Sequence, residues 1–297
     1  MKNLYDEWAK HSLDTMGREE LNEAYIEVMQ AAGQNASTNH PRRKAGRNLP
    51  FRAGVAACCA AVAILLAGGI LYLALKRDAV KEQVQLCELT TANGQIRKLC
   101  LPDGTQVTLN SGSTLIYPER YGKGERRAYL SGEAIFEVTK NGTPFIVNTA
   151  DLEICVHGTV FNVNAYPESR SASATLCSGS ISARIKATGK EIDMIPSQNL
   201  TYNKENSSYE LSEVDTSEDT AWESGKLCFS SKTVHEIAKI LERTYGVNVY
   251  VTSGKYDKAL LTAKFIYGES LNDVMRAICR LVPDMKYSID GSNIYIK

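Results

Sequence analysis

The chain has no excess of charge of either sign, because 34 lysines and arginines balance 34 aspartates and glutamates. A protein that binds DNA or RNA usually carries a basic excess or a basic face. The balance therefore argues against nucleic acid as a direct partner. Apolar residues at 43% and charged residues at 23% are typical of folded proteins and argue against a disordered chain.

Recognisable catalytic motifs are also missing: there is no H-E-x-x-H, G-x-S-x-G, P-loop or G-x-G-x-x-G. Cys155 and His157 lie two residues apart, but no third group is evident to orient them for nucleophilic catalysis. Glu133 and Glu137 lie on one short strand pattern, where carboxylates are usually surface charges rather than a glycosidase pair. We therefore expect no enzyme, with no catalytic residue, no metal site and no cofactor.

The eight cysteines form neither C-x-x-C nor a zinc-finger spacing to histidine. Two are adjacent in an apolar run, and the others are Cys87, Cys100, Cys155, Cys177, Cys228 and Cys279. If the C-terminal part is exported, Cys87 and Cys100 are one candidate disulfide. The alternative, which we favour, is six free and mostly buried thiols that behave as small apolar residues.

A long uncharged apolar segment runs from residue 53 to residue 75. As a helix it would span about 34 Å, enough to cross a hydrocarbon core of about 30 Å. A buried core helix normally carries a polar stripe, and a cleaved signal peptide has a shorter apolar region nearer the N-terminus. The segment therefore predicts a single transmembrane helix, followed by a juxtamembrane connector at 76–97.

Basic residues predict the orientation of this helix. The upstream ones are Arg42, Arg43, Lys44, Arg47 and Arg52, and the downstream ones are Lys76, Arg77 and Lys81. The upstream excess favours an N-terminus inside the cell and an exported C-terminal part. The polar, basic linker at 33–52 is also suited to contact anionic membrane lipid.

The N-terminal tail, residues 1–32, carries weak helical patterns. Leu21, Ala24, Tyr25 and Val28 fall at i, i+3, i+4 and i+7, and Tyr5 and Trp8 lie on a similar spacing with Leu4. Such short helices cannot bury enough surface to be stable alone. We therefore expect their apolar faces to bind a partner or the membrane surface.

Residues 98–203 alternate short β-type runs with glycine-containing turns. The expected strands are 106–110, 114–117, 127–130, 134–139, 145–148, 153–157, 160–165, 172–177 and 180–185. Many short strands at regular spacing without a long helix are typical of a sandwich, barrel or solenoid. We expect an all-β domain, solenoid- or sandwich-like, followed by a linker at 204–225.

Residues 226–297 change character to a small α+β domain. Thr233 and Glu236 form a capping box that opens a helix, and Ser270 and Asp273 repeat the arrangement 37 residues later. Expected helices end near 245 and 282, and expected strands lie at 226–229, 247–252, 261–267, 286–289 and 293–297. This predicts duplicated helix–strand units in two βαβ-like halves, whose exposed sheet edges suit strand addition by another protein.

Several ordered motifs carry a resemblance. The runs LPDGTQVTLNSGSTLIYP (101–118), ERRAYLSGEAIFEV (125–138), PFIVNT (144–149) and GTVFNVNAY (158–166) resemble the periplasmic domain of FecR-type transmembrane anti-sigma factors. The segments 220–251 and 270–297 resemble the C-terminal domain common in that family among Bacteroidota, which is similar to the short secretin and TonB N-terminal-like fold.

This resemblance implies an inner-membrane regulator with a cytoplasmic N-terminus and a periplasmic C-terminus. Family members hold an extracytoplasmic-function (ECF) sigma factor through the tail and sense the N-terminal signalling domain of a TonB-dependent outer-membrane receptor. Regulatory proteases then release the sigma factor. The tail here, 52 residues, is shorter than is usual in the family. If it binds a sigma factor, the expected anchors are Tyr5, Trp8, Leu21, Tyr25 and Val28, because aromatic and aliphatic groups dominate interface hot spots.

Two alternatives stay open at this point. A membrane-anchored periplasmic interaction scaffold without a sigma partner would fit the short tail. An anchored periplasmic enzyme, acting on carbohydrate for example, would require a pocket with converging carboxylates or a metal.

Overall fold

The computed structural model describes residues 85–122 and 124–297. The expected tail, basic linker and transmembrane helix at 1–75 lie outside the described residues, as does the first part of the 76–97 connector. Among the residues that are described, no helix is both long and apolar enough to cross a membrane.

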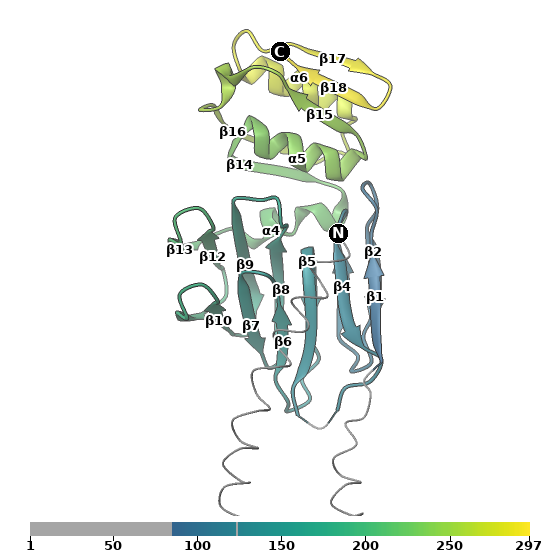
Figure 1. Ribbon diagram of the computed structural model, residues 1–297, viewed down its shortest axis with the longest axis vertical. Coiled ribbons are helices and arrows are strands. Elements are labelled where there is room, and N and C mark those ends of the chain that lie inside the picture. Colours follow the sequence, from purple (N-terminus) through teal and green to yellow (C-terminus); the bar gives the residue numbers. More distant parts are fainter. Residues whose placement is uncertain (1–84, 123) are drawn as a thin grey trace, which may run out of the picture. The chain divides into compact units, whose positions relative to one another are not determined.

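The N-terminal part of the described chain, which we call the β domain (residues 85–213), contains two sheets that share strand β5 (Figure 1). The first sheet has the order β1 (Leu86–Thr90), β4 (Thr114–Pro118), β5 (Arg126–Glu137), β6 (Phe145–Asn148), β7 (Leu152–Val156), β10 (Ile181–Ile185), β11 (Glu191–Met194). The second sheet has the order β2 (Arg97–Cys100), β3 (Gln106–Leu109), β5, β8 (Val160–Ala165), β9 (Ser171–Ser178), β12 (Gln198–Asn203), β13 (Tyr209–Glu213). Neighbouring strands are antiparallel except for the parallel pair β5–β6.

Strand β5 passes from one sheet to the other at Gly132. Residues 126–131 pair with β4 and β6, and residues 132–137 pair with β3 and β8. Gly132 has a φ of +113°, and a Cβ at this position would lie 2.7 Å from the Cα of Ser113. The sequence predicts two strands, 127–130 and 134–139, separated at this glycine. The structure has one strand instead, because glycine lets the backbone bend while its hydrogen-bonded ladder continues.

The two sheets pack face to face around an aromatic core. Phe136 and Phe161 of the second sheet stack with ring centroids 5.3 Å apart, and Phe136 lies 6.1 Å from Phe145 of the first sheet. All three side chains are fully buried, as are the apolar residues that alternate along the neighbouring strands. The expected all-β domain is therefore confirmed, in a sandwich-like form.

A buried ion pair closes one end of this core. The Nη1 of Arg126 donates to Asp103 at 2.6 Å, and both side chains are almost completely buried. The guanidinium also donates to the carbonyl oxygens of Thr139 and Thr143 and lies 5.4 Å from the Phe145 ring centroid. Separating the pair would leave a buried charge without a partner, so the contacts of Arg126 hold the loops around Asp103 and Thr139–Thr143 in place.

Two segments expected to be connectors contain regular structure. β1 lies within 76–97, and β13 lies within 204–225 together with α4 (Thr216–Asp219) and the 3-10 turn η1 (Ala221–Ser224). β1 and β13 are the outermost strands of their sheets. Their residues are exposed or half-buried, so both strands have a weak apolar alternation and give little sequence signal for a strand.

The C-terminal domain (residues 226–297) has its own core and two small sheets (Figure 1). Its elements are β14 (Leu227–Thr233), α5 (Val234–Tyr245), β15 (Asn248–Val251), η2 (Gly254–Tyr256), β16 (Leu260–Phe265), α6 (Leu271–Leu281), β17 (Tyr287–Asp290) and β18 (Asn293–Ile296). β14 pairs with β16, and the other sheet has the order β15–β18–β17. β14 and β15 of the first expected βαβ-like half therefore pair with β16 and β18 of the second half. Within the second half, β17 and β18 also pair with each other.

The predicted helix starts are present. In the capping box of α5, the Thr233 hydroxyl accepts from the backbone of Glu236, whose carboxylate accepts from the backbone of Thr233. The Ser270 hydroxyl accepts from the backbone of Asp273 at the start of α6. Both helices turn a strongly apolar face to the domain core, and this tertiary packing stabilises helices that would be marginal in isolation.

We expect Gly132→Ala to lower the free energy of unfolding by roughly 3 kcal/mol or more, because the added Cβ strains the backbone and overlaps Ser113. Urea unfolding followed by circular dichroism measures the change. Gly122→Ala is the control, since nothing lies within 4 Å of that position. Equal losses in the two variants would contradict the assigned role of Gly132.

Replacing Arg126 by methionine should cost about 3–5 kcal/mol of stability, because Asp103 is left as an unpaired buried carboxylate. The matched control is Arg127→Met at the next residue, whose ion pairs with Glu125 and Glu153 are partly exposed and should each contribute less than about 1 kcal/mol. The same unfolding experiment compares the two. A small effect at Arg126 would mean that the buried pair is dispensable.

Candidate functional site at the domain junction

The residues expected to anchor a sigma factor, Tyr5, Trp8, Leu21, Tyr25 and Val28, lie outside the described residues. Their role stays a prediction from sequence. The sites that the structure does describe belong to the β domain, the C-terminal domain and the bridging segment between them, residues 214–225.

The cysteines and the Cys155–His157 pair show no feature of a reactive site in the described part of the chain. All six described cysteines are free. Burial raises the pKa of the Cys155 thiol, so the thiolate needed for nucleophilic attack is disfavoured. Cys87 lies two residues from Leu89, which packs on the core, whereas Cys100 is adjacent to Leu99, which also packs on the core. Side chains alternate along a strand, so Cys87 on β1 faces the core while Cys100 on β2 faces away from it. Both thiols are free, and the candidate disulfide is not formed.

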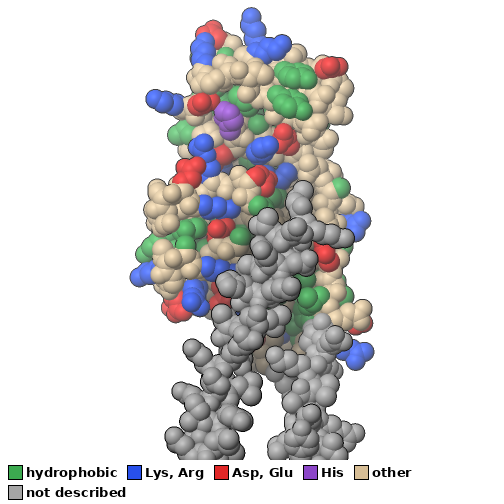
Figure 2. Space-filling model, viewed as in Figure 1, with side chains coloured by type: hydrophobic (Ala, Val, Ile, Leu, Met, Phe, Trp, Pro, Cys, Tyr) green, Lys and Arg blue, Asp and Glu red, His purple; other side chains and the backbone are tan. Residues whose placement is uncertain are grey.

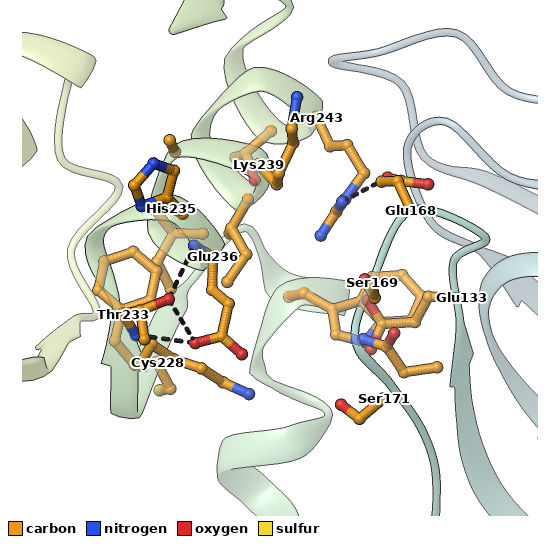
Figure 3. A pocket seen from close by; sticks show the side chains of 18 of the residues that line it. Glu133, Glu168, Ser169, Ser171, Cys228, Thr233, His235, Glu236, Lys239 and Arg243 are labelled. Carbon is orange, nitrogen blue, oxygen red and sulfur yellow. Dashed lines mark hydrogen bonds and ion pairs between the residues drawn. The ribbon is translucent and has the colours of Figure 1, made fainter. Parts of the chain in front are cut away.

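A cavity of about 660 Å³ lies where the C-terminal domain meets the outer face of the second sheet (Figure 3). The second sheet contributes a polar floor, which we define as Asn110, Glu133, Asn162, Asn164, Ser173 and Thr175. The opposite wall comes from α5 and β15, and Asp219 and Trp222 of the bridging segment also line the cavity.

Glu133 is the buried carboxylate of this floor. It lies on β5 next to Ala134, which faces the core, so its own side chain points to the outer face of the second sheet. Asn110 Nδ2 donates to one carboxylate oxygen at 2.7 Å and Asn162 Nδ2 donates to the other at 3.0 Å. Burial raises the pKa of Glu133 above its ordinary value, and these amides and the nearby Arg243 lower that pKa in part.

The bridging segment is held on the same face by side-chain contacts. Thr175 donates its hydroxyl to the Asp219 carboxylate at 2.6 Å, and Asn199 Nδ2 donates to the same carboxylate at 3.4 Å. Farther along, Glu223 accepts from Lys98 and from the hydroxyl of Thr108. These contacts run from strand to strand across the second sheet, so this segment belongs structurally to the β domain.

Arg243, in the last turn of α5, connects the C-terminal domain to the β domain (Figure 3). Its guanidinium carbon lies 3.8 Å from the ring centroid of Tyr166, and Nη1 lies 2.8 Å from the Glu168 carboxylate. Its backbone oxygen accepts from the Gly94 N–H at 2.7 Å. Tyr166 is itself fixed, because it is buried and its hydroxyl donates to the Ser111 carbonyl at 2.8 Å.

The carboxylates at the junction are engaged by other groups. Glu133 accepts from two amides, Glu168 is paired with Arg243, and Glu236 is engaged in the capping box. Glu137, the other carboxylate noted in the sequence, is exposed at the far end of β5. Within the part of the chain that the structure describes, no group of three or more His, Cys, Asp or Glu is placed to hold a metal.

The C-terminal domain also presents exposed apolar side chains and open strand edges. Tyr267 is 88% exposed, Leu260 is 64% exposed, and Tyr250 stacks on Tyr295 with centroids 5.2 Å apart. β15 and β17 are the outer strands of their sheet, and β14 and β16 pair only with each other. Figure 2 shows acidic and basic side chains interspersed on the face in view, with apolar groups near the C-terminal domain. These features suit a protein partner better than a polyanion.

Sequence reasoning missed the Arg243 cluster and the role of Glu133. The one sequence signal for Glu133 was its position as a carboxylate within a strand pattern of alternating apolar residues. Arg243 gave no local signal, because its partners Tyr166 and Glu168 are distant in the sequence.

The raised pKa of Glu133 predicts a pH dependence of stability. The folded state holds the proton more tightly than the unfolded state, so the contribution of Glu133 to stability is greatest at low pH and is lost as the pH rises from about 4.5 through the raised value. The wild type should thus lose stability relative to Glu133→Gln over this window, by about 1.4 kcal/mol for each tenfold difference in proton affinity between the two states.

Urea unfolding at several pH values tests this dependence, with Glu137→Gln as the control for a carboxylate lost from the same strand. A difference in stability between wild type and Glu133→Gln that does not change with pH would contradict it.

Both domains are similar to known protein families and to solved structures. The family model described as FecR protein matches residues 88–182, and the model described as FecR, C-terminal, matches residues 226–296. Two crystal structures of a proposed anti-sigma factor from Parabacteroides distasonis are similar, each with a TM-score of 0.68. They are 27% and 26% identical, and each match covers 71% of this chain and 98% of theirs. No curated protein matches.

The two matched segments correspond to the β domain and the C-terminal domain described above, in the same order along the chain. The similar structures extend over both. The chain belongs to the FecR family.

Proposed function

We propose that this chain is a transmembrane anti-sigma factor, or sigma regulator, that relays a signal from a TonB-dependent outer-membrane receptor to a cytoplasmic ECF sigma factor. The observation that carries the proposal is the FecR domain followed by its C-terminal domain, in a chain similar to a proposed anti-sigma factor. Such a protein works by binding and release, in agreement with a junction whose carboxylates are engaged by other groups.

The membrane location rests on the sequence. Residues 53–75 carry no charge, and the basic residues are more numerous upstream of this segment than downstream. In this proposal the helix lies in the inner membrane, the tail is cytoplasmic and the two described domains are periplasmic. The basic linker contacts anionic lipid, and regulatory proteases act near the helix to release the sigma factor.

The receptor side rests on the surface of the C-terminal domain. Its two small sheets expose strand edges, and large apolar groups such as Leu260 and Tyr267 lie in solvent. A folded signalling domain that adds a strand to such an edge gains main-chain hydrogen bonds, and exposed side chains beside the edge supply specificity. We assign this domain as the contact for the N-terminal signalling domain of the receptor.

The second candidate is a membrane-anchored interaction scaffold without a sigma partner. The observation that favours it is the weak helical patterning of residues 1–32, where two short apolar spacings are recognised. The two candidates share the periplasmic contacts and differ in what the tail binds.

The discriminating experiment isolates the full-length chain from membranes of its own cells and identifies the co-purified cytoplasmic proteins by mass spectrometry. We expect an ECF sigma factor with the wild type and at least a tenfold loss with a Trp8→Ala/Tyr25→Ala double variant, because aromatic anchors carry most of an interface's binding energy, roughly 2 kcal/mol or more each. Ile26→Ala is the matched control. On the expected helix, Ile26 is an apolar residue outside the stripe of Leu21, Tyr25 and Val28, about 100° around the axis from Tyr25 and farther from the other two.

Absence of any sigma factor from the wild-type sample, with the chain intact in the membrane, would contradict the sigma-regulator proposal and favour the scaffold. An equal loss in the Ile26→Ala control would contradict the assignment of the binding face.

A further inference from the structure

The two domains have separate hydrophobic cores. The core of the β domain contains residues 101–202, and that of the C-terminal domain contains residues 227–296. Between the two cores lies the cavity of about 660 Å³, which both polar and apolar side chains line. An interface that encloses a cavity leaves part of its surface without contact, so the specific contacts around the cavity matter for holding the two domains together.

Most of those specific contacts involve Arg243. Its side chain is 14% exposed, stacks on Tyr166 and pairs with Glu168, while its carbonyl accepts from Gly94. A second ion pair joins Lys264 to Glu218 of the bridging segment, but about half of the Lys264 side chain is exposed. Exposed pairs of that kind contribute little, whereas a guanidinium stacked on a buried aromatic ring is both shielded and oriented.

The internal duplication shows that this arginine is not needed to fold the helix–strand unit. The shift of 37 residues that relates α5 to α6 places Arg280 at the position equivalent to Arg243. Arg280 is exposed to solvent. The second unit therefore forms its helix and core with this side chain in water, so the buried contacts of Arg243 serve docking rather than folding.

A glycine separates the bridging segment from the C-terminal domain. Gly225 ends the bridging segment with a φ of +73°, and no atom lies within 4 Å of the position that a Cβ would take. The segment before it is held on the second sheet by Asp219 and Glu223, and the C-terminal domain begins directly after it. Uncrowded residues of this type absorb backbone rotation when domains close or open.

We propose that Arg243 is a latch between two states of the domain pair. In the docked state its side chain occupies the socket formed by Gly112, Tyr166 and Glu168. In the undocked state the C-terminal domain turns about Gly225, and the polar floor is open to solvent. A partner that binds the C-terminal domain more tightly in the undocked state shifts the equilibrium toward that state. Binding to the C-terminal domain thereby exposes the polar floor of the β domain.

The amide of Gly94 is a built-in reporter of docking, because its N–H donates across the junction to the Arg243 carbonyl. The Gly104 amide is the internal reference, since it donates to Leu101 within the β domain. Hydrogen–deuterium exchange by mass spectrometry on the full-length chain, in detergent or nanodiscs, follows both. We expect Arg243→Ala to accelerate exchange of the peptide containing Gly94 at least about tenfold and to leave the Gly104 peptide unchanged.

Two further variants make the test specific. Arg280→Ala removes the equivalent exposed arginine and should leave exchange at Gly94 at the wild-type rate. Glu168→Ala removes the ion pair through a half-exposed residue outside both cores, and should accelerate exchange at Gly94 even if Arg243→Ala proves unstable.

Wild-type exchange at Gly94 in both Arg243→Ala and Glu168→Ala would overturn the latch. So would an equal acceleration in Arg280→Ala. None of these readouts requires a receptor or a sigma factor, so their failure is distinct from failure of the proposed function.

Discussion

The bend of β5 at Gly132 is the constraint on which the rest of the described structure depends. β5 belongs to both sheets. Its first half pairs within the first sheet and its second half pairs within the second sheet, so the strand lies on both sides of the core. The same bend gives the second sheet an outer face, and Glu133 is the first residue after it. Placement of the polar floor, the bridging segment and the docked helix all follow from a position that only glycine can occupy without displacing Ser113.

Burial is distributed unevenly around this framework. Apolar side chains fill the two cores, while the junction between them mixes apolar side chains with carboxylates, amides and one stacked arginine around a cavity. Stability therefore resides inside each domain, and the relation between the domains depends on contacts that can be exchanged. This is the distribution expected of a protein that transmits an event from one domain to another, because a large apolar interface would hold a single arrangement.

Local chemistry made a good part of the fold predictable from sequence. The strands expected at 145–148 and 160–165 coincide with β6 and β8, because their apolar runs are bounded by turn residues. The start of α5 followed from Thr233 and Glu236, whose side chains satisfy the first helical N–H groups. The features that were not predicted depend on distant partners. The sequence around Gly132 does not show whether the strand bends or ends there. The outcome depends on which distant strands pair with β5 before and after this glycine. The docking of Arg243 likewise joins residues 75 positions apart.

The proposed function requires that the two described domains lie across a membrane from the N-terminal tail. Cys100 offers the most direct test, because it is exposed on β2. A membrane-impermeant maleimide is added to cells with a permeabilised outer membrane and an intact inner membrane, and labelling is compared between the wild type and Cys100→Ser. We predict that the wild type is labelled under these conditions and that the variant loses this label. Labelling of Cys100 only after the inner membrane is broken would contradict the proposed topology.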